Sequence, residues 1–575
     1  MIVYRDQRRQ ADPALLLDEL SGRVCRLSLR PDHDGVVAVL VELGVVETAV
    51  SDALSVEADG WTPLQRTLRR ATQAAGHLLW HSWHDGRGLE EWRARLQGLL
   101  GAARGAELPP VVELRTPEGF SHYGVYPETY LEAGVRCARE LQPTRAVCLG
   151  IRSIGTSLSG AVVAALEESG CMVESYTIRP RGHPFDRHVV LTAELESALR
   201  AAAPWSHFVL VDEGPGISGS SLAGAAEALG RLGVADDRIV LMPSWRTDGT
   251  GLNSDLARDR WRRHRQFTAS FDEVWLDSGR LGGAAPGPGI RDLSAGAWRE
   301  LLIPGDGERP AVQPQHERRK LLARGRLYSF AGLGRYGEPK LERTRELAEA
   351  GFTPAPLALE HGFLVRNFVA GQPVGPAERD RGLIKKMARY LAHLRTHYRR
   401  ESAAAPNLQE MMEVNTGEAL GASGTRALAT RLRSSSQAIE APVALDGRMM
   451  PHEWLRTSHG FLKVDVADHH DDHFFPGCQD IAWDVAGTCV EFDLRGDERR
   501  GFVERYRRAA GDWSIGPRLR FHAVAYLCFR VGYASLAAKV LGDTPDGRRF
   551  RLLQSRYADA LREELSLSGQ SRWDA

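Results

Sequence analysis

The chain has 575 residues, of which 43% are hydrophobic and 26% charged, and its 74 basic residues equal its 74 acidic ones. This balance gives no reason to expect a nucleic-acid partner or an acidic membrane surface. There is neither a run of eighteen apolar residues nor an apolar signal core at the N-terminus, so we expect a cytoplasmic protein without a membrane span, built of about three domains.

Residues 1–108 are predicted to form a small α+β domain with an accessory role. Strands are expected over 24–29 (VCRLSL) and 35–51 (GVVAVLVELGVVETAVS), and helices over 62–83 and 88–103. This part contains no motif with a chemical meaning. Two roles are possible for this domain. It can be an oligomerisation element, in which case the protein can be a homodimer, or it can be a hood that covers a neighbouring site.

Residues 109–277 alternate between strand and helix patterns, which predicts an α/β domain with a parallel sheet. The stretch 208–222 reads FVLVDEGPGISGSSL: an apolar strand, the acidic pair Asp212 and Glu213, a loop of small residues and the start of a helix. Backbone N–H groups at such a helix start suit a phosphate group. The carboxylates suit vicinal hydroxyls or a metal bound to them, so the pattern indicates a sugar phosphate.

This stretch resembles the PRPP-binding motif of the type I phosphoribosyltransferases. Asp212 and Glu213 match the acidic pair, which in that family holds the ribose and its Mg²⁺. The resemblance implies that the following loop holds the 5-phosphate through Gly214, Ser218, Gly219, Ser220 and Ser221. The loop at 150–157 would hold pyrophosphate through Gly150, Ser153 and Arg152, with Arg179 and Arg181 on a basic segment that covers the leaving group.

The implied reaction is Mg-PRPP-dependent phosphoribosyl transfer to a small-molecule acceptor that the sequence does not identify. Three other interpretations stay open at this point. The acidic pair can belong to an ordinary strand-to-helix turn, the basic segment can be a solvated hairpin, and the domain can be a sensor that binds PRPP or a nucleotide without catalysis.

Residues 278–312 are rich in Gly and Pro and are predicted to be a linker with a docking helix in DLSAGAWRELL, at 292–302. Residues 313–575 follow the order hairpin, helix, two strands and then mostly helices. This half resembles the aminoglycoside phosphotransferase and choline kinase-like fold, a two-lobed α+β domain. The segment NFVAGQPV at 367–374 matches the hinge, Asp465 the metal-binding aspartate, and Asp480 with Asp484 the helix-anchoring pair.

The catalytic loop departs from that family. Aligned with it, LDGRMMPHEWL at 445–455 has Asp446 at the histidine, Arg448 at the catalytic aspartate and Glu453 at the metal-binding asparagine. Ser329 stands where the ATP-binding lysine is expected, and Lys320 on the neighbouring strand is the candidate substitute. An arginine cannot accept the proton of a hydroxyl nucleophile. The half therefore either phosphorylates the transferase product with ATP, or binds a nucleotide as a regulator, with Mg²⁺ on Asp465 and Glu453.

A cluster of aspartates and histidines follows directly after that strand. Mixed ligands of this kind can bind manganese, iron or zinc. A metal-dependent hydrolase therefore remains an alternative for this half. The cluster consists of Asp465, Asp468, His469, His470, Asp471, Asp472 and His473.

Overall fold

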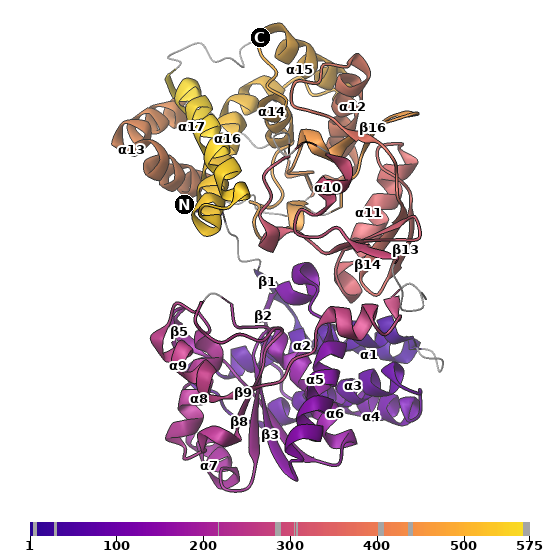
Figure 1. Ribbon diagram of the computed structural model, residues 1–575, viewed down its shortest axis with the longest axis vertical. Helices are drawn as coiled ribbons and strands as arrows, with labels where there is room; N and C mark the ends of the chain where they lie inside the picture. Colours follow the sequence, from indigo (N-terminus) through magenta and orange to yellow (C-terminus); the bar gives the residue numbers. More distant parts are fainter. Residues whose placement is uncertain are drawn as a thin grey trace.

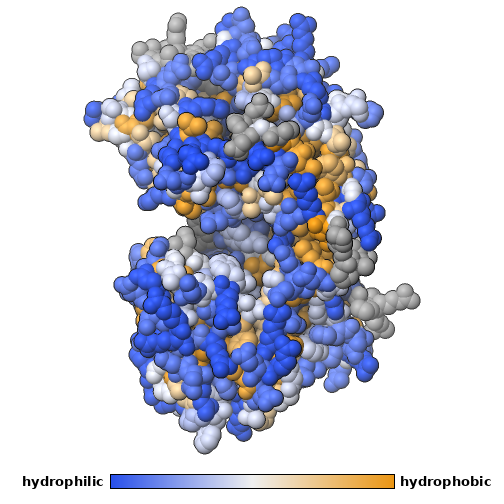
Figure 2. Space-filling model, viewed as in Figure 1, coloured by the Kyte–Doolittle hydropathy of each residue, from blue (hydrophilic) through white to orange (hydrophobic). Residues whose placement is uncertain are grey.

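The computed structural model describes residues 1–3, 8–27, 32–216, 218–281, 289–303, 305, 309–400, 408–434, 441–467 and 469–566. They form a mixed α/β protein of two lobes, with α1–α9 in one lobe and α10–α17 in the other (Figure 1). Figure 2 shows that the surface is hollowed between the lobes on the face in view.

The described part of residues 1–108 is mainly helical. It contains β1 (Arg8–Ala11), α1 (Pro13–Arg26), α2 (His33–Leu54), α3 (Pro63–Trp83) and α4 (Leu89–Arg104), and β1 pairs with β2 (Val112–Arg115). The helices expected over 62–83 and 88–103 are confirmed as α3 and α4. The strand expected over 35–51 is wrong, because these residues lie in α2, and Val24–Arg26 end α1. Residues 28 and 29 lie outside the described residues.

Burial explains the wrong strand prediction. Every residue of α2 from Val36 to Ser51 is buried, and the helix lies against α1, α3 and α6 (Ile154–Glu168). A helix that is apolar on all sides shows no 3.6-residue period, so its many valines resemble a buried strand.

The predicted parallel sheet is confirmed. Its strands are β3 (Arg145–Ile151), β4 (Met172–Ile178), β7 (His207–Val211), β8 (Ile239–Met242) and β9 (Arg265–Gln266), all parallel, in the order β4-β3-β7-β8-β9. Helices α5 (Pro127–Leu141) and α6 cover one face, and α7 (Ala193–Ala202), α8 (Ser220–Arg231) and α9 (Asp255–Arg263) the other.

The order of the strands reverses between β3 and β7. In open α/β sheets the crevice at such a switch point, outside the carboxyl ends of the strands, is where ligands bind. Here the crevice receives the loop after β3, the acidic pair after β7 and a hairpin of β5 (Arg181–His183) and β6 (Asp186–His188).

The second lobe begins with an antiparallel sheet of order β10-β11-β12-β14-β13. The strands are β10 (Ile290–Asp292), β11 (Lys320–Ala323), β12 (Arg326–Phe330), β13 (Pro356–Glu360) and β14 (Phe363–Asn367), with α11 (Glu338–Glu349) between β12 and β13. The hairpin, helix and strand pair predicted for this half are thus present. The segment expected as a linker contributes β10 to this sheet and also contains α10 (Trp298–Leu302).

The rest of the second lobe is a helical body with a small sheet. Helices α12 (Arg381–His397), α13 (Leu408–Ser434), α14 (Ala482–Glu491), α15 (Gly496–Ala510), α16 (Ile515–Leu541) and α17 (Pro545–Ser566) surround β15 (Gln372–Pro373), β16 (Trp454–Thr457) and β17 (Gly460–Lys463). By length and composition α16 could cross a membrane, but 67% of its apolar window is buried, as in the core helix of a globular lobe.

One hydrophobic core joins the two lobes. Tyr126 and Trp275 from the first lobe pack together with Phe330 and Phe363 from the sheet of the second. The Tyr126 hydroxyl also donates a hydrogen bond to the carbonyl oxygen of His361, at 2.7 Å. The five-stranded sheet of the second lobe is therefore packed on the first lobe as part of one interior.

Candidate functional site

The segment that carries Asp446 and Glu453 is held in place by α14. The Asp484 carboxylate accepts the backbone N–H groups of Asp446 and Gly447, at 2.8 and 2.9 Å. Asp480 accepts the N–H of Ala482 at 2.9 Å and pairs with the buried Arg518 of α16. Asp484 therefore holds the backbone of the loop before β16 in position, and Asp480 ties the start of α14 to α16.

A lysine ammonium occupies the centre of the acidic cluster. Lys463 is fully buried, and its Nζ lies 3.0 Å from Asp446 Oδ2 and 2.8 Å from Glu453 Oε2. It also donates to the carbonyl oxygen of Asp465, at 2.6 Å. Burial lowers the pKa of Lys463, but Asp446 and Glu453 raise it more, to about 12. The ammonium is therefore charged at neutral pH.

The sequence predicted Glu453 as a metal ligand, but in the structure its carboxylate contacts two cationic side chains. One carboxylate oxygen faces Lys463, and the other lies 3.3 Å from the Arg448 guanidinium. Asp446, Glu453 and His469 have ligand atoms within 4.8 Å of one another, which suits a cation. Lys463 already supplies that cation, so these residues do not fit a further Mg²⁺ ion.

Asp465 and Lys320 are neighbours in the lining of a smaller cavity of about 150 Å³. Lys320 Nζ lies 3.8 Å from Asp465 Oδ2, and His469 Nε2 lies 3.6 Å from the same oxygen. Lys320 is paired in register with Ser329, so the two strands place both side chains at the cavity. The buried Ser329 hydroxyl has no hydrogen-bond partner among the residues that the structure describes.

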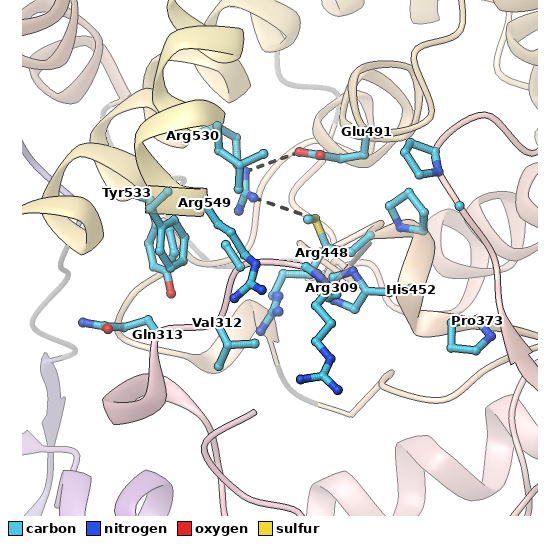
Figure 3. Close-up of a pocket in the computed structure, with 18 of the residues that line it drawn as sticks. Arg309, Val312, Gln313, Pro373, Arg448, His452, Glu491, Arg530, Tyr533 and Arg549 are labelled. Carbon is cyan, nitrogen blue, oxygen red and sulfur yellow. Dashed lines mark hydrogen bonds and ion pairs between the residues drawn. The ribbon is translucent and has the colours of Figure 1, made fainter. Parts of the chain in front are cut away.

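A larger cavity, of about 1080 Å³, adjoins the smaller one and shares Arg448, His452 and His469 with it. Figure 3 shows Arg309, Arg448 and Arg549 meeting at this cavity from different elements. Aromatic rings complete the lining. They belong to Phe474, Phe475, Phe529, Tyr533 and Phe550. Guanidinium groups beside aromatic rings suit an anionic ligand with a planar part.

The described residues of the predicted His/Asp cluster do not gather around one ion. Of the cluster, only His469 belongs to a group with metal-ligand spacing among the described residues, and Lys463 occupies the centre of that group. Asp468 lies outside the described residues. The hydrolase alternative therefore has no ligand set in the part that the structure describes.

The acidic pair lies in the crevice of the parallel sheet. Asp212 and Glu213 are half-buried at the end of β7, and Asp212 accepts the N–H of Glu213 at 2.8 Å. Burial raises the pKa of Asp212 to about 6, and burial together with the Asp212 charge raises that of Glu213 to about 8. The following loop reaches the hairpin, because the Ser220 hydroxyl donates to the carbonyl oxygen of Pro184 at 2.6 Å. Of the other predicted loop residues, Gly214, Ser218 and Gly219 belong to the connection between β7 and α8, and Ser221 is the second residue of α8.

The arginines predicted to contact pyrophosphate form ion pairs with aspartates in this structure. Arg152 is buried and bonded to Asp52 at 2.7 Å and to Asp59. Arg179 is paired with Asp52, and Arg181 lies 3.2 Å from Asp59. These ion pairs bind the end of α2 and the segment after it to the ends of β3 and β4. They were not predictable from spacing, since the partners lie 93 to 127 residues apart.

The loop at 150–157, which the resemblance implied would hold pyrophosphate, is covered by α2. Gly150 is buried, and α2 lies over the loop, with the hydroxyls of Thr48 and Thr156 at 2.9 Å. Ser153 is half-buried with a φ of 133°, and Thr48 donates to its carbonyl oxygen at 3.4 Å. Non-glycine residues rarely adopt this φ, and such strain persists only where the surroundings hold it.

No family model matches the chain, and no curated protein matches it in sequence. In structure it is similar to a choline/ethanolamine kinase family protein from Mesorhizobium loti, at 16% identity and a TM-score of 0.32, over 44% of this chain and 87% of that one. It is also similar to an ethanolamine kinase from Plasmodium vivax, at 8% identity and a TM-score of 0.33, over 60% and 95% of the two chains. An aminoglycoside 2'-phosphotransferase in complex with GDP matches at 14% identity and a TM-score of 0.30, over 44% and 93%. Similarities at these values carry no argument about function, and they lend no support to phosphoribosyl transfer.

Proposed function

We propose that the second lobe binds a nucleoside phosphate between β11, β12 and the segment 446–472, and transfers its phosphoryl group poorly. The observation that carries this proposal is the Lys463 ammonium between Asp446 and Glu453, beside Arg448. The cleft has a fixed internal cation where a kinase of the resembled fold would need a metal and a base.

The charges around the cleft favour an anion over a free metal ion. Three carboxylates, Asp446, Glu453 and Asp465, face the cations Lys463, Arg448, Lys320 and His469. Burial lowers the pKa of His469, but Asp465 and Asp446 raise it more, to about 10, so its ring is charged at neutral pH. The carboxylates are thus already neutralised, and a phosphate group would bring the negative charge that the cleft lacks.

The residues of the loop explain the low transfer activity that we expect. Arg448 is permanently charged and cannot accept a proton. Asp446 is buried under Lys463 and the Tyr390 hydroxyl, which donates to it at 2.6 Å. A missing general base typically costs a factor of about 10² to 10⁴ in rate.

Replacing Lys320 with alanine should weaken ATP binding about 10- to 100-fold, because a hydrogen bond to a charged group contributes about 1.5–3 kcal/mol. Calorimetric titration of the full chain with ATP, with and without Mg²⁺, measures this, and ATP turnover is recorded in parallel. The matched control is Lys385→Ala, an exposed lysine on α12. Equal affinities in both variants would refute the assignment of Lys320, and rapid turnover lost in Asp465→Asn would show a working kinase instead.

The acidic pair favours a second proposal, phosphoribosyl transfer from Mg-PRPP in the crevice of the parallel sheet. Asp212 and Glu213 lie at the switch point of the sheet, and the loop after them is joined to the hairpin by the hydrogen bond from the Ser220 hydroxyl to the Pro184 carbonyl oxygen. The acceptor is a small molecule of unknown identity. Because Arg152, Arg179 and Arg181 are paired with aspartates, the pyrophosphate would have to be met by Arg187 of the hairpin, which is half-buried near Asp212.

The affinity for Mg-PRPP should rise between pH 6 and pH 8, because the pKa values of about 6 and about 8 place the ionisation of the pair there. The fold also binds more protons than the unfolded chain between about pH 4 and pH 8, so the stability contributed by the pair falls as the pH rises through this window. Asp212→Asn with Glu213→Gln should abolish binding and flatten both pH profiles. Calorimetry and denaturation at several pH values test this, with the exposed Asp237→Asn as the control. Binding retained in the double variant would exclude the transferase proposal.

A further inference from the structure

A group of histidines and glutamates lies away from both clefts, where α3 packs on the end of α6. His77 and His81 are one helical turn apart on α3, and Glu167 and Glu168 are the last residues of α6. His77 Nδ1 lies 3.1 Å from Glu168 Oε1, and His81 Nε2 lies 3.5 Å from the same oxygen. We propose that His77, His81 and Glu168 bind a divalent transition-metal ion of the zinc class.

The spacing of the three ligand atoms suits such an ion. Zinc binds nitrogen and carboxylate oxygen at about 2.0–2.2 Å in tetrahedral sites, which places neighbouring ligand atoms about 3.3–3.5 Å apart. The two measured separations, 3.1 and 3.5 Å, lie close to this value, and all three ligand atoms lie within 4.8 Å of one another.

Glu167 supplies the outer contact that a metal-binding histidine needs. Its Oε2 lies 2.7 Å from His77 Nε2, so this ring nitrogen donates its hydrogen to the carboxylate. In the neutral ring, Nδ1 then directs its lone pair at Glu168, an unfavourable contact unless a cation lies between them. Trp92 stacks on the ring at 3.8 Å with an interplanar angle of 2°, which fixes its orientation.

The end of α6 also needs a positive charge. The C-terminus of a helix carries a partial negative charge, and here two glutamates occupy its last turn, which contains no basic residue. A metal ion would balance these charges and tie α3 to α6. Side-chain exposures of 29% for Glu168 and 14% for His81 leave the group open to solvent, so that water can complete the coordination.

The test uses the full chain, stripped with a chelator and titrated with ZnCl₂ by calorimetry and with CoCl₂ by visible absorption. The unsubstituted chain should bind one equivalent, and Co²⁺ should show the intense bands of a tetrahedral site. His81→Ala and Glu168→Gln should lose both signals, whereas Glu167→Gln should weaken binding about 10- to 100-fold. The control is His84→Ala, an exposed histidine on the same helix end, which should bind as the unsubstituted chain does.

Two results would overturn the metal site. One is the absence of Zn²⁺ binding to the unsubstituted chain, which would mean that a protonated His77 ring is the cation between the glutamates. The other is that both His81→Ala and Glu168→Gln still bind one equivalent of Zn²⁺, which would place the ion elsewhere. Glu168 is exposed, so Glu168→Gln keeps the fold, and circular dichroism of each variant verifies this.

Discussion

Lys463→Met should destabilise the second lobe by about 3–5 kcal/mol, the usual cost of removing one partner from a buried ion pair. The substitution leaves Asp446 and Glu453 buried without the ammonium that lies within 3.0 Å of both. Denaturant unfolding followed by circular dichroism measures the change in the free energy of unfolding.

Two further variants separate the charge from the loss of packing. Asp446→Asn and Glu453→Gln, added to Lys463→Met, should restore part of the stability, since neither carboxylate then remains as a buried charge without the ammonium. Lys463→Met alone should be less destabilised at pH 5 than at pH 8, because protonation relieves the unpaired carboxylates. Lys385→Met on the surface should stay within about 0.5 kcal/mol of the unsubstituted chain. A Lys463→Met chain of unchanged stability would show that the ammonium does not neutralise the cluster.

Arg152→Met should have an effect of similar size on the first lobe, about 3–5 kcal/mol. Arg152 is fully buried between Asp52 and Asp59, and Asp59 is itself fully buried. Its loss leaves Asp59 with the weaker contacts of Arg181, at 3.2 Å, and the backbone N–H of Arg179. Unfolding of the full chain, followed at both lobes, measures the loss.

This result distinguishes a structural arginine from one that acts on substrate. If Arg152 binds pyrophosphate, Arg152→Met loses turnover at unchanged stability. The control is Arg66→Ala, whose exposed pair with Glu194 should contribute no more than about 1 kcal/mol. Equal stability of Arg152→Met and Arg66→Ala would support a role of Arg152 in binding pyrophosphate.

The local pattern of the sequence was sufficient for most elements near the proposed sites. The apolar strand 208–211, the acidic pair and the helix after the small-residue loop are where the pattern predicted them, as are the β11–β12 hairpin and α11. These elements depend on neighbours within a few residues. Helix α2 did not follow its pattern, because its burial on all sides is set by α1, α3 and α6.

By itself the sequence determined the parallel sheet and the acidic pair at the end of a strand. Only the tertiary structure decided which charges are available to a ligand. It pairs Arg152 with Asp59, and it places Lys463 between Asp446 and Glu453. It also joins Tyr126 and Phe330 in one core across the boundary expected near residue 277. The reason is that secondary structure follows from local periodicity, whereas ion pairing and burial depend on distances between residues far apart in the chain.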